Sequence, residues 1–192
     1  MRQSRRIWAH AIRAVAVAGW LASAPAFAAY GVFADIPGIP GDATFPPATN
    51  QIQAISFTWN VHQLKSTRLG TAGVCSAGRT KPVFDQLCLV KHADKASPKL
   101  FLAAMQGTDF AKITISFYDL TQPSNPPYDV YELSHAIVST VQTSHQGGDE
   151  IPTESVCFNF DQVKTTVNAP NPAGGPVDTV TATFNACTRD VQ

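Results

Sequence analysis

Alternation of apolar and polar residues is the feature that most restricts the fold of this 192-residue chain. In residues 52–61 the apolar side chains Ile55, Phe57, Trp59 and Val61 occupy every second position. Successive side chains of a β-strand point to opposite faces, so this spacing predicts a strand with one buried face. The other stretches with a strand-like pattern are residues 83–91, 113–117, 128–143, 156–160 and 177–187. The sequence therefore predicts a chain that consists mainly of β-strands.

One stretch has the pattern of a helix instead. Ser97 is placed to cap its N-terminus, Pro98 suits a first helical position, and Gly107 suits the left-handed residue that often ends a helix. One short helix among about seven strands, with turn-forming Pro and Gly residues between them, is typical of an all-β domain. We expect a mainly β fold, an antiparallel β-barrel or sandwich with one short flanking α-helix.

The first 28 residues have the composition of a signal peptide. Four arginines precede an apolar run at residues 14–24, and Ala26-Phe27-Ala28 satisfies the small-residue rule for cleavage. The apolar run is shorter than the roughly 20 residues of a membrane-spanning helix. We therefore expect cleavage near Ala28 and a secreted or periplasmic protein without membrane attachment. An uncleaved N-terminal anchor is the alternative, and the sequence does not distinguish the general secretory route from the twin-arginine route.

The four cysteines are expected to form disulfides. They are Cys75, Cys88, Cys157 and Cys187, all of which remain after cleavage. An even number of cysteines in an exported chain favours disulfides, and the absence of CxxC spacing argues against a zinc or redox site.

A hairpin argument selects among the three possible connectivities. If residues 156–167 and 177–187 pair as antiparallel strands about residue 172, Phe160 lies opposite Phe184 and both apolar faces coincide. The same register places Cys157 opposite Cys187, within reach of a disulfide. The remaining pair is then Cys75 with Cys88.

Residues with catalytic potential are sparse. The chain lacks HExxH, GxSxG, GxGxxG and Walker motifs, and its histidines are not spaced as metal ligands. The polar cluster at residues 144–150 contains Ser144, His145, Asp149 and Glu150, but adjacent loop side chains rarely converge as a triad. We expect a solvated loop there, no catalytic, cofactor-binding or metal-binding residue, and no enzyme.

Composition excludes several other classes. Fourteen basic residues balance fourteen acidic ones, 44% of residues are hydrophobic and 15% are charged. An intrinsically disordered chain has lower hydrophobicity and higher net charge, and a nucleic-acid-binding protein usually has a basic face. We therefore expect a folded domain and no nucleic-acid partner.

Five short blocks, in order along the chain, resemble those of the haemolysin-coregulated protein (Hcp) family. They are DIPGIPGD at residues 35–42, ISFTW at 55–59, DKASPKL at 94–100, VSTVQT at 138–143 and PTESV at 152–156. The residues that the resemblance marks as packing, turn or interface positions are Asp35, Gly38, Gly41, Trp59, Asp94, Lys95, Ser97, Pro98, Thr153, Glu154 and Ser155. The likeness extends from about Ala34 to Val167.

The resemblance implies a compact β-barrel with a flanking helix and no catalytic residues. Six such barrels form a ring, and rings stack into the inner tube of the bacterial type VI secretion system. The implied partners are further copies of this chain, effector proteins and proteins of the secretion apparatus; no cofactor is implied. Gly38 and Gly41 would form turns, and residues 94–98 would begin the helix.

Two features depart from the family pattern: the signal peptide and the C-terminal residues 168–192. We expect residues 29–167 to form the Hcp-like barrel, and residues 168–192 to supply a loop and an added strand packed on it. That strand would weaken or block ring formation. The first functional hypothesis is a secreted, non-enzymatic ring or tube subunit; the alternative is a disulfide-stabilised periplasmic or extracellular binding module that acts outside the apparatus.

Overall fold

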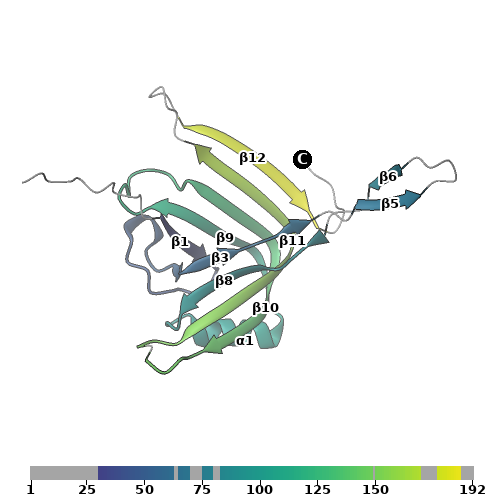
Figure 1. The fold of residues 1–192 in the computed structure, drawn as a ribbon. Helices are drawn as coiled ribbons and strands as arrows, with labels where there is room; N and C mark the ends of the chain where they lie inside the picture. Colours follow the sequence, from purple (N-terminus) through teal and green to yellow (C-terminus); the bar gives the residue numbers. More distant parts are fainter. Residues whose placement is uncertain are drawn as a thin grey trace, which may run out of the picture.

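The computed structural model describes residues 30–62, 65–69, 75–79, 83–148, 150–169 and 177–186, with the backbone alone for 65–69 and 75–79 (Figure 1). The expected signal peptide and Cys187 lie outside these residues.

The described residues are mostly in β-strands. The helices are α1 (Ser97–Gln106) and the 3₁₀ turn η1 (Pro46–Ala48). The strands are β1 (Tyr30–Asp35), β2 (Ile52–Ala54), β3 (Ser56–Thr58), β4 (Val61–His62), β5 (Lys65–Leu69), β6 (Cys75–Arg79), β7 (Val83–Phe84), β8 (Leu87–His92), β9 (Asp109–Asp119), β10 (Asp129–Ser144), β11 (Thr153–Ala169) and β12 (Asp178–Asn185).

Eight strands form one antiparallel sheet that nearly closes on itself. Its order is β2-β1-β9-β10-β11-β8-β3, with β12 paired to β11 beside this path (Figure 1). The first and last strands of the path, β2 and β3, are separated in the chain by Ile55 alone. Because the two edges of the path meet at one residue, the sheet curls into a barrel. This confirms the predicted mainly β fold with one flanking helix.

The core fills the barrel with alternating side chains from long strands. Ile113 and Ile115 of β9, Leu133 of β10 and Val163 of β11 are completely buried. Burying one such side chain contributes roughly 1.5–3 kcal/mol relative to leaving it exposed. The two-residue period therefore predicted the burial of Ile113 and Ile115 correctly.

The alternation fails at Ile55, which the sequence placed on the buried face. The side chain of Ile55 is 54% exposed, whereas Ile52 and Ala54 are buried. Ile55 lies between β2 and β3, and its backbone N–H donates to the carbonyl of Val90 at 2.6 Å. Ile55 interrupts the alternation of inward and outward side chains. Phe57 in β3 therefore packs against the core, although strict alternation from Ile52, five residues earlier, would place it on the opposite face.

The helix α1 lies against β10 and ends as predicted. Leu100 and Ala103 are buried, whereas Met105 on another side of the helix is 77% exposed. Gly107 ends the helix in the left-handed conformation, with φ 61° and ψ 39°, and its N–H donates to Ala103. Glycine adopts this conformation without the steric cost that a Cβ would add.

The two family glycines of the opening loop differ in their roles. Gly38 has a φ of 78° and lies in the turn that joins the paired residues Ile36 and Ile39. Gly41 instead allows a close approach, because a Cβ there would collide with the carbonyl oxygen of Gln51. The prediction that both glycines form turns is thus confirmed for Gly38 only.

The added strand is present, but its predicted register is wrong. β12 pairs antiparallel with β11, and Phe184 lies opposite Val163 rather than Phe160. The paired residues sum to 347 instead of 344, because β11 continues to Ala169 and β12 begins only at Asp178. The longer first strand moves the centre of the hairpin towards the C-terminus.

Both predicted disulfide pairs are wrong, because the structure joins Cys88 to Cys157. Along its first half, β11 is paired with β8, which places these two residues directly opposite each other with Cα atoms 4.1 Å apart. β12 pairs only with the second half of β11, from Gln162 onwards, so Cys157 has β8 as its neighbour instead. Nothing is assigned to the side chain of Cys75, which lies among the residues described by backbone alone, or to Cys187.

Candidate functional site

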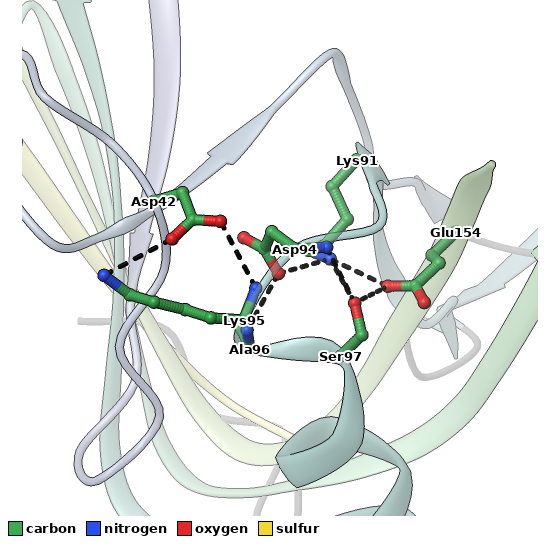
Figure 2. A network of polar contacts seen from close by, with 7 residues as sticks. All are labelled: Asp42, Lys91, Asp94, Lys95, Ala96, Ser97 and Glu154. Carbon is green, nitrogen blue, oxygen red and sulfur yellow. Dashed lines mark hydrogen bonds and ion pairs between the residues drawn. The ribbon is translucent and has the colours of Figure 1, made fainter. Parts of the chain in front are cut away.

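Three of the family-like blocks meet at the start of α1, and two of them, residues 94–100 and 152–156, surround one buried lysine, Lys91 of β8 (Figure 2). Its side chain is 1% exposed, and its ammonium group contacts three oxygens. These are Oε2 of Glu154 at 2.7 Å, Oδ1 of Asp94 at 2.8 Å and Oγ of Ser97 at 3.1 Å. An ammonium group has three donors, so every donor of Lys91 has a partner.

Ser97 connects this lysine to the helix, but not as the predicted cap. Its hydroxyl donates to Oε2 of Glu154 at 2.7 Å and accepts the backbone N–H of Asp94 at 3.0 Å. The cap position is held by Ala96, and Ser97 and Pro98 are the first two helical residues. The prediction of a Ser97 cap is therefore wrong, because its side chain bonds to the barrel instead of the free N–H groups of the helix.

Asp94 supplies the bonds that begin the helix. Its Oδ1 accepts the N–H of Ala96 at 2.9 Å, and its backbone carbonyl accepts the N–H of Ser97 at 3.1 Å. The same Oδ1 contacts Lys91. One carboxylate therefore both orders the turn before α1 and balances the buried ammonium group.

A second, exposed part of the network reaches the opening loop. The carboxylate of Asp42 accepts the backbone N–H of Lys95 at 3.3 Å and lies 3.4 Å from its ammonium group (Figure 2). Lys99 donates to the carbonyl of Gly38 at 2.8 Å. Exposed ion pairs of this kind contribute little stability, so we assign to them the positioning of the loop rather than its stabilisation.

The other marked residues lie apart from this network. Asp35 ends β1, and Thr153 and Ser155 pair with His92 and Val90 across the β8–β11 ladder. Trp59 lies among aromatic rings, 5.9 Å from Tyr131 and 6.2 Å from Phe160 between ring centroids. Its indole nitrogen is buried without a hydrogen-bond partner among the described residues.

Sequence reasoning missed Lys91, although a signal was present. Leu87, Leu89 and Lys91 share one face of β8, and the two leucines are completely buried or nearly so. A lysine in the buried phase of a strand needs a carboxylate partner, because an unpaired buried charge is very costly. Glu154 occupies the buried phase of β11 in the same way, two residues before Val156.

The buried part of the network leaves no cavity beside Lys91. The apolar gap beside Lys91, bounded by residues that include Leu89 and Leu100, does not admit a water molecule. A surface hollow of about 380 Å³ lies nearby, and its two carboxylates, Asp42 and Asp94, are already engaged by lysines and backbone N–H groups. In the part of the chain that the structure describes, no three His, Cys, Asp or Glu residues are grouped as metal ligands. The arrangement fixes α1 to the barrel.

The predicted polar loop at residues 144–150 joins β10 to β11. Ser144, His145 and Glu150 are exposed, and Asp149 lies outside the described residues. Exposure of these groups agrees with the solvated loop expected from the sequence.

Tyr131 is one of the aromatic residues around Trp59, and its surroundings oppose the ionisation of its phenol. Burial raises its pKa to about 12, and the charge of Asp129 and a hydrogen bond with it act in the same direction. Burial also raises the pKa of Asp129, one of whose carboxylate oxygens is buried without a partner. The neutral phenol is therefore the form that the fold favours.

We expect the protein to lose stability between about pH 10 and 12 through Tyr131. A folded-state pKa above the unfolded value means that this contribution is complete below pH 10 and disappears as the pH rises through the folded pKa. Urea denaturation at several alkaline pH values should show a smaller loss in Tyr131→Phe than in the unchanged protein. The exposed residue Tyr30 provides the matched Tyr30→Phe control, and equal pH profiles for both variants would contradict the assignment.

Among the described residues, no helix combines the length and apolar character that crossing a membrane requires. The fold and the network together define a class of protein: a small, nearly closed antiparallel β-barrel with one helix fixed to it by a buried ion-pair network. The sequence profile of a family described as "Type VI secretion system effector, Hcp" matches residues 33–167. The chain therefore belongs to the Hcp family.

Individual relatives agree with this assignment. Protein Hcp1 of Pseudomonas aeruginosa is 29% identical over 92 residues, which cover 48% of this chain and 56% of that protein. The match thus spans little more than half the length of this relative. The crystal structure of Hcp1 from Salmonella typhimurium has a TM-score of 0.66 at 26% identity, covering 85% of this chain and 99% of that one. A structure described as a type six secretion system protein has a TM-score of 0.73 at 20% identity, covers 85% of this chain and 100% of that one, and shows likeness of fold alone.

Proposed function

We propose that this protein is a non-enzymatic structural protein of the Hcp family, a ring or tube subunit or an exported relative of one, that acts after export from the cytoplasm. The observation that carries the proposal is the nearly closed barrel, whose strands β1 and β11 contain the two ends of the segment matched by the family. The family blocks bring polar residues together at the start of α1, and their hydrogen bonds and ion pairs join this helix to the barrel. This arrangement supports a structural role. The partners would be further copies of the chain, effector proteins and proteins of the secretion apparatus.

The export step rests on the N-terminal sequence and on the disulfide. Disulfides persist in oxidising compartments, and Cys88 is joined to Cys157 across β8 and β11. We propose that residues 1–28 are removed, that residues 29–167 form the barrel domain, and that residues 168–192 add a loop and strand to it. The mature protein would be periplasmic or secreted.

N-terminal sequencing of the protein recovered outside the cytoplasm tests the export proposal. We expect its first residue to be Ala29 or to lie within a few residues of it, because Ala26-Phe27-Ala28 provides the cleavage site. Ala26→Leu together with Ala28→Leu should retain the longer precursor. Recovery of exported protein that begins at Met1 would contradict cleavage.

The C-terminal strand is proposed to weaken the ring. β12 covers the backbone of β11 from Gln162 to Ala169, which would otherwise be open for a neighbouring barrel. Phe184 of β12 also stacks on Phe84 of β7, with ring centroids 3.9 Å apart, so the strand is held at its end. If β12 occupies part of the contact surface, two neighbouring subunits bury less area against each other. A specific interface is difficult to maintain below roughly 1,000 Å² of buried area.

We expect removal of the C-terminal segment to increase assembly. Light scattering at matched concentrations would compare the mature chain with the same chain ended after Ala169, which retains all of β11. The shortened chain should reach the mass of a hexamer, while the full mature chain stays well below it. Hexamers of the full mature chain would contradict the blocking role of the strand, and the absence of a ring from both chains would contradict the ring proposal itself and favour the binding-module alternative.

A further inference from the structure

β12 borders a described strand on one side only. β12 pairs with β11 on one side, and no described strand pairs with its other side. The N–H of Ala186 donates to the carbonyl of Asp161 at 2.7 Å, so even-numbered residues of this strand direct their backbone groups towards β11. The odd-numbered residues Thr179, Thr181 and Thr183 therefore direct their N–H and C=O groups outwards.

This edge has few of the features by which natural sheets prevent pairing. Its sequence, DTVTATFN, contains no Lys, Arg, Pro or Gly, and its pairing with β11 has no bulge. Residues 178–182 are exposed, and the side chain of Val180 is 62% exposed. Thr, Val and Phe are residues that favour extended strands. An exposed edge of this composition is suited to accept another strand.

We propose that the outer edge of β12 pairs antiparallel with β12 of a second copy, about a two-fold axis at Thr181. Hydrogen-bonded pairs must join outward-facing residues of both copies, and this axis places Thr179 opposite Thr183 and Thr181 opposite itself. About six main-chain hydrogen bonds result, two for each pair.

The side chains favour a second copy as the partner. The single charged residue of the strand, Asp178, lies opposite Phe184 of the other copy, so the two carboxylates do not oppose each other. Val180 of one copy lies opposite Ala182 of the other, so pairing brings together two apolar side chains that are exposed in the single copy. Self-pairing thus covers exposed apolar surface without opposing like charges. A strand from a different protein would need side chains that match the apolar and charged positions of β12 equally well.

The resulting contact differs in kind from a ring contact. A two-fold contact uses the same surface on both copies and closes as a dimer, whereas ring contacts join two different surfaces. The inference goes beyond the proposed ring function and does not depend on it, because β12 pairing would double the mass of whatever assembly the rest of the surface forms.

Charged substitutions at Thr181 test the proposal in the mature protein. Thr181→Lys places two lysines directly opposite each other, and Thr181→Glu does the same with two carboxylates, so each variant should have half the mass of the unchanged protein by light scattering. An equimolar mixture of the two variants should regain the full mass, because unlike charges then face each other. Thr181→Val is the matched control that alters the side chain without adding charge, and it should retain the full mass.

Thr181→Pro provides a second test, because it removes a backbone N–H donor from the outer edge of β12. Its missing N–H faces away from β11, so the pairing of β12 with β11 keeps all its main-chain hydrogen bonds and loses only the contact between the Thr166 and Thr181 hydroxyls. Proline is tolerated at such an edge. We expect the mass to fall to half while the circular dichroism spectrum stays unchanged. Equal masses for the unchanged protein, Thr181→Pro and both charged variants would overturn the proposal, as would a mixture of the charged variants that stays at half mass.

Discussion

Replacement of Lys91 by methionine is expected to lower the free energy of unfolding by about 3–5 kcal/mol. The substitution preserves most of the volume of the side chain but removes the cation from the carboxylates of Glu154 and Asp94. Glu154 is 2% exposed, so its charge would remain buried with only the hydroxyl of Ser97 as a described partner. Urea denaturation of both proteins at neutral pH measures the difference.

The same block of sequence offers a matched control. Lys95 also pairs with an aspartate, Asp42, but the side chains are 46% and 59% exposed. Lys95→Met should therefore cost less than about 1 kcal/mol. The double variant Lys91→Met, Glu154→Leu should regain part of the stability lost in Lys91→Met, because it removes the unpaired carboxylate. A loss for Lys91→Met no greater than that for Lys95→Met would contradict the structural role of the buried network.

Removal of the disulfide is the other large effect that we expect. Cys88 and Cys157 are 69 residues apart, and the chain-entropy estimate for a loop of this length is about 4 kcal/mol. The double variant Cys88→Ala, Cys157→Ala should therefore unfold at a lower urea concentration than the unchanged protein. Addition of a reductant should bring the unchanged protein close to the double variant and leave the double variant itself unaffected.

The other cysteines supply the control for this experiment. Cys75→Ser together with Cys187→Ser leaves the bond between β8 and β11 in place and should preserve most of its stabilisation. Peptide mapping without reduction should recover Cys88 linked to Cys157. A peptide that links Cys157 to Cys187 would contradict this pairing and restore the one inferred from the hairpin argument.

The sequence alone determined the class of fold and where several elements end. A two-residue period at Ile113 and Ile115 requires an extended strand with one buried face, whatever the neighbouring strand is. Gly107 ends α1 because the left-handed conformation needed there is open to glycine at little cost. The family resemblance likewise rested on contiguous blocks. Such features depend on neighbours in the chain, which a sequence displays directly.

Only the tertiary structure decided the partners of residues distant in the chain. Cys157 bonds to Cys88 because β11 is long enough to have β8 beside one half and β12 beside the other, and alternation along a single strand contains no information on its neighbours. The phase change at Ile55 likewise arises where the barrel closes. Lys91 and Glu154 lie 63 residues apart, and each is a costly buried charge until the β8–β11 register brings them to 2.7 Å. The sequence thus determined local conformation, whereas pairing register decided the disulfide and the buried ion pair, because both depend on long-range contacts between strands.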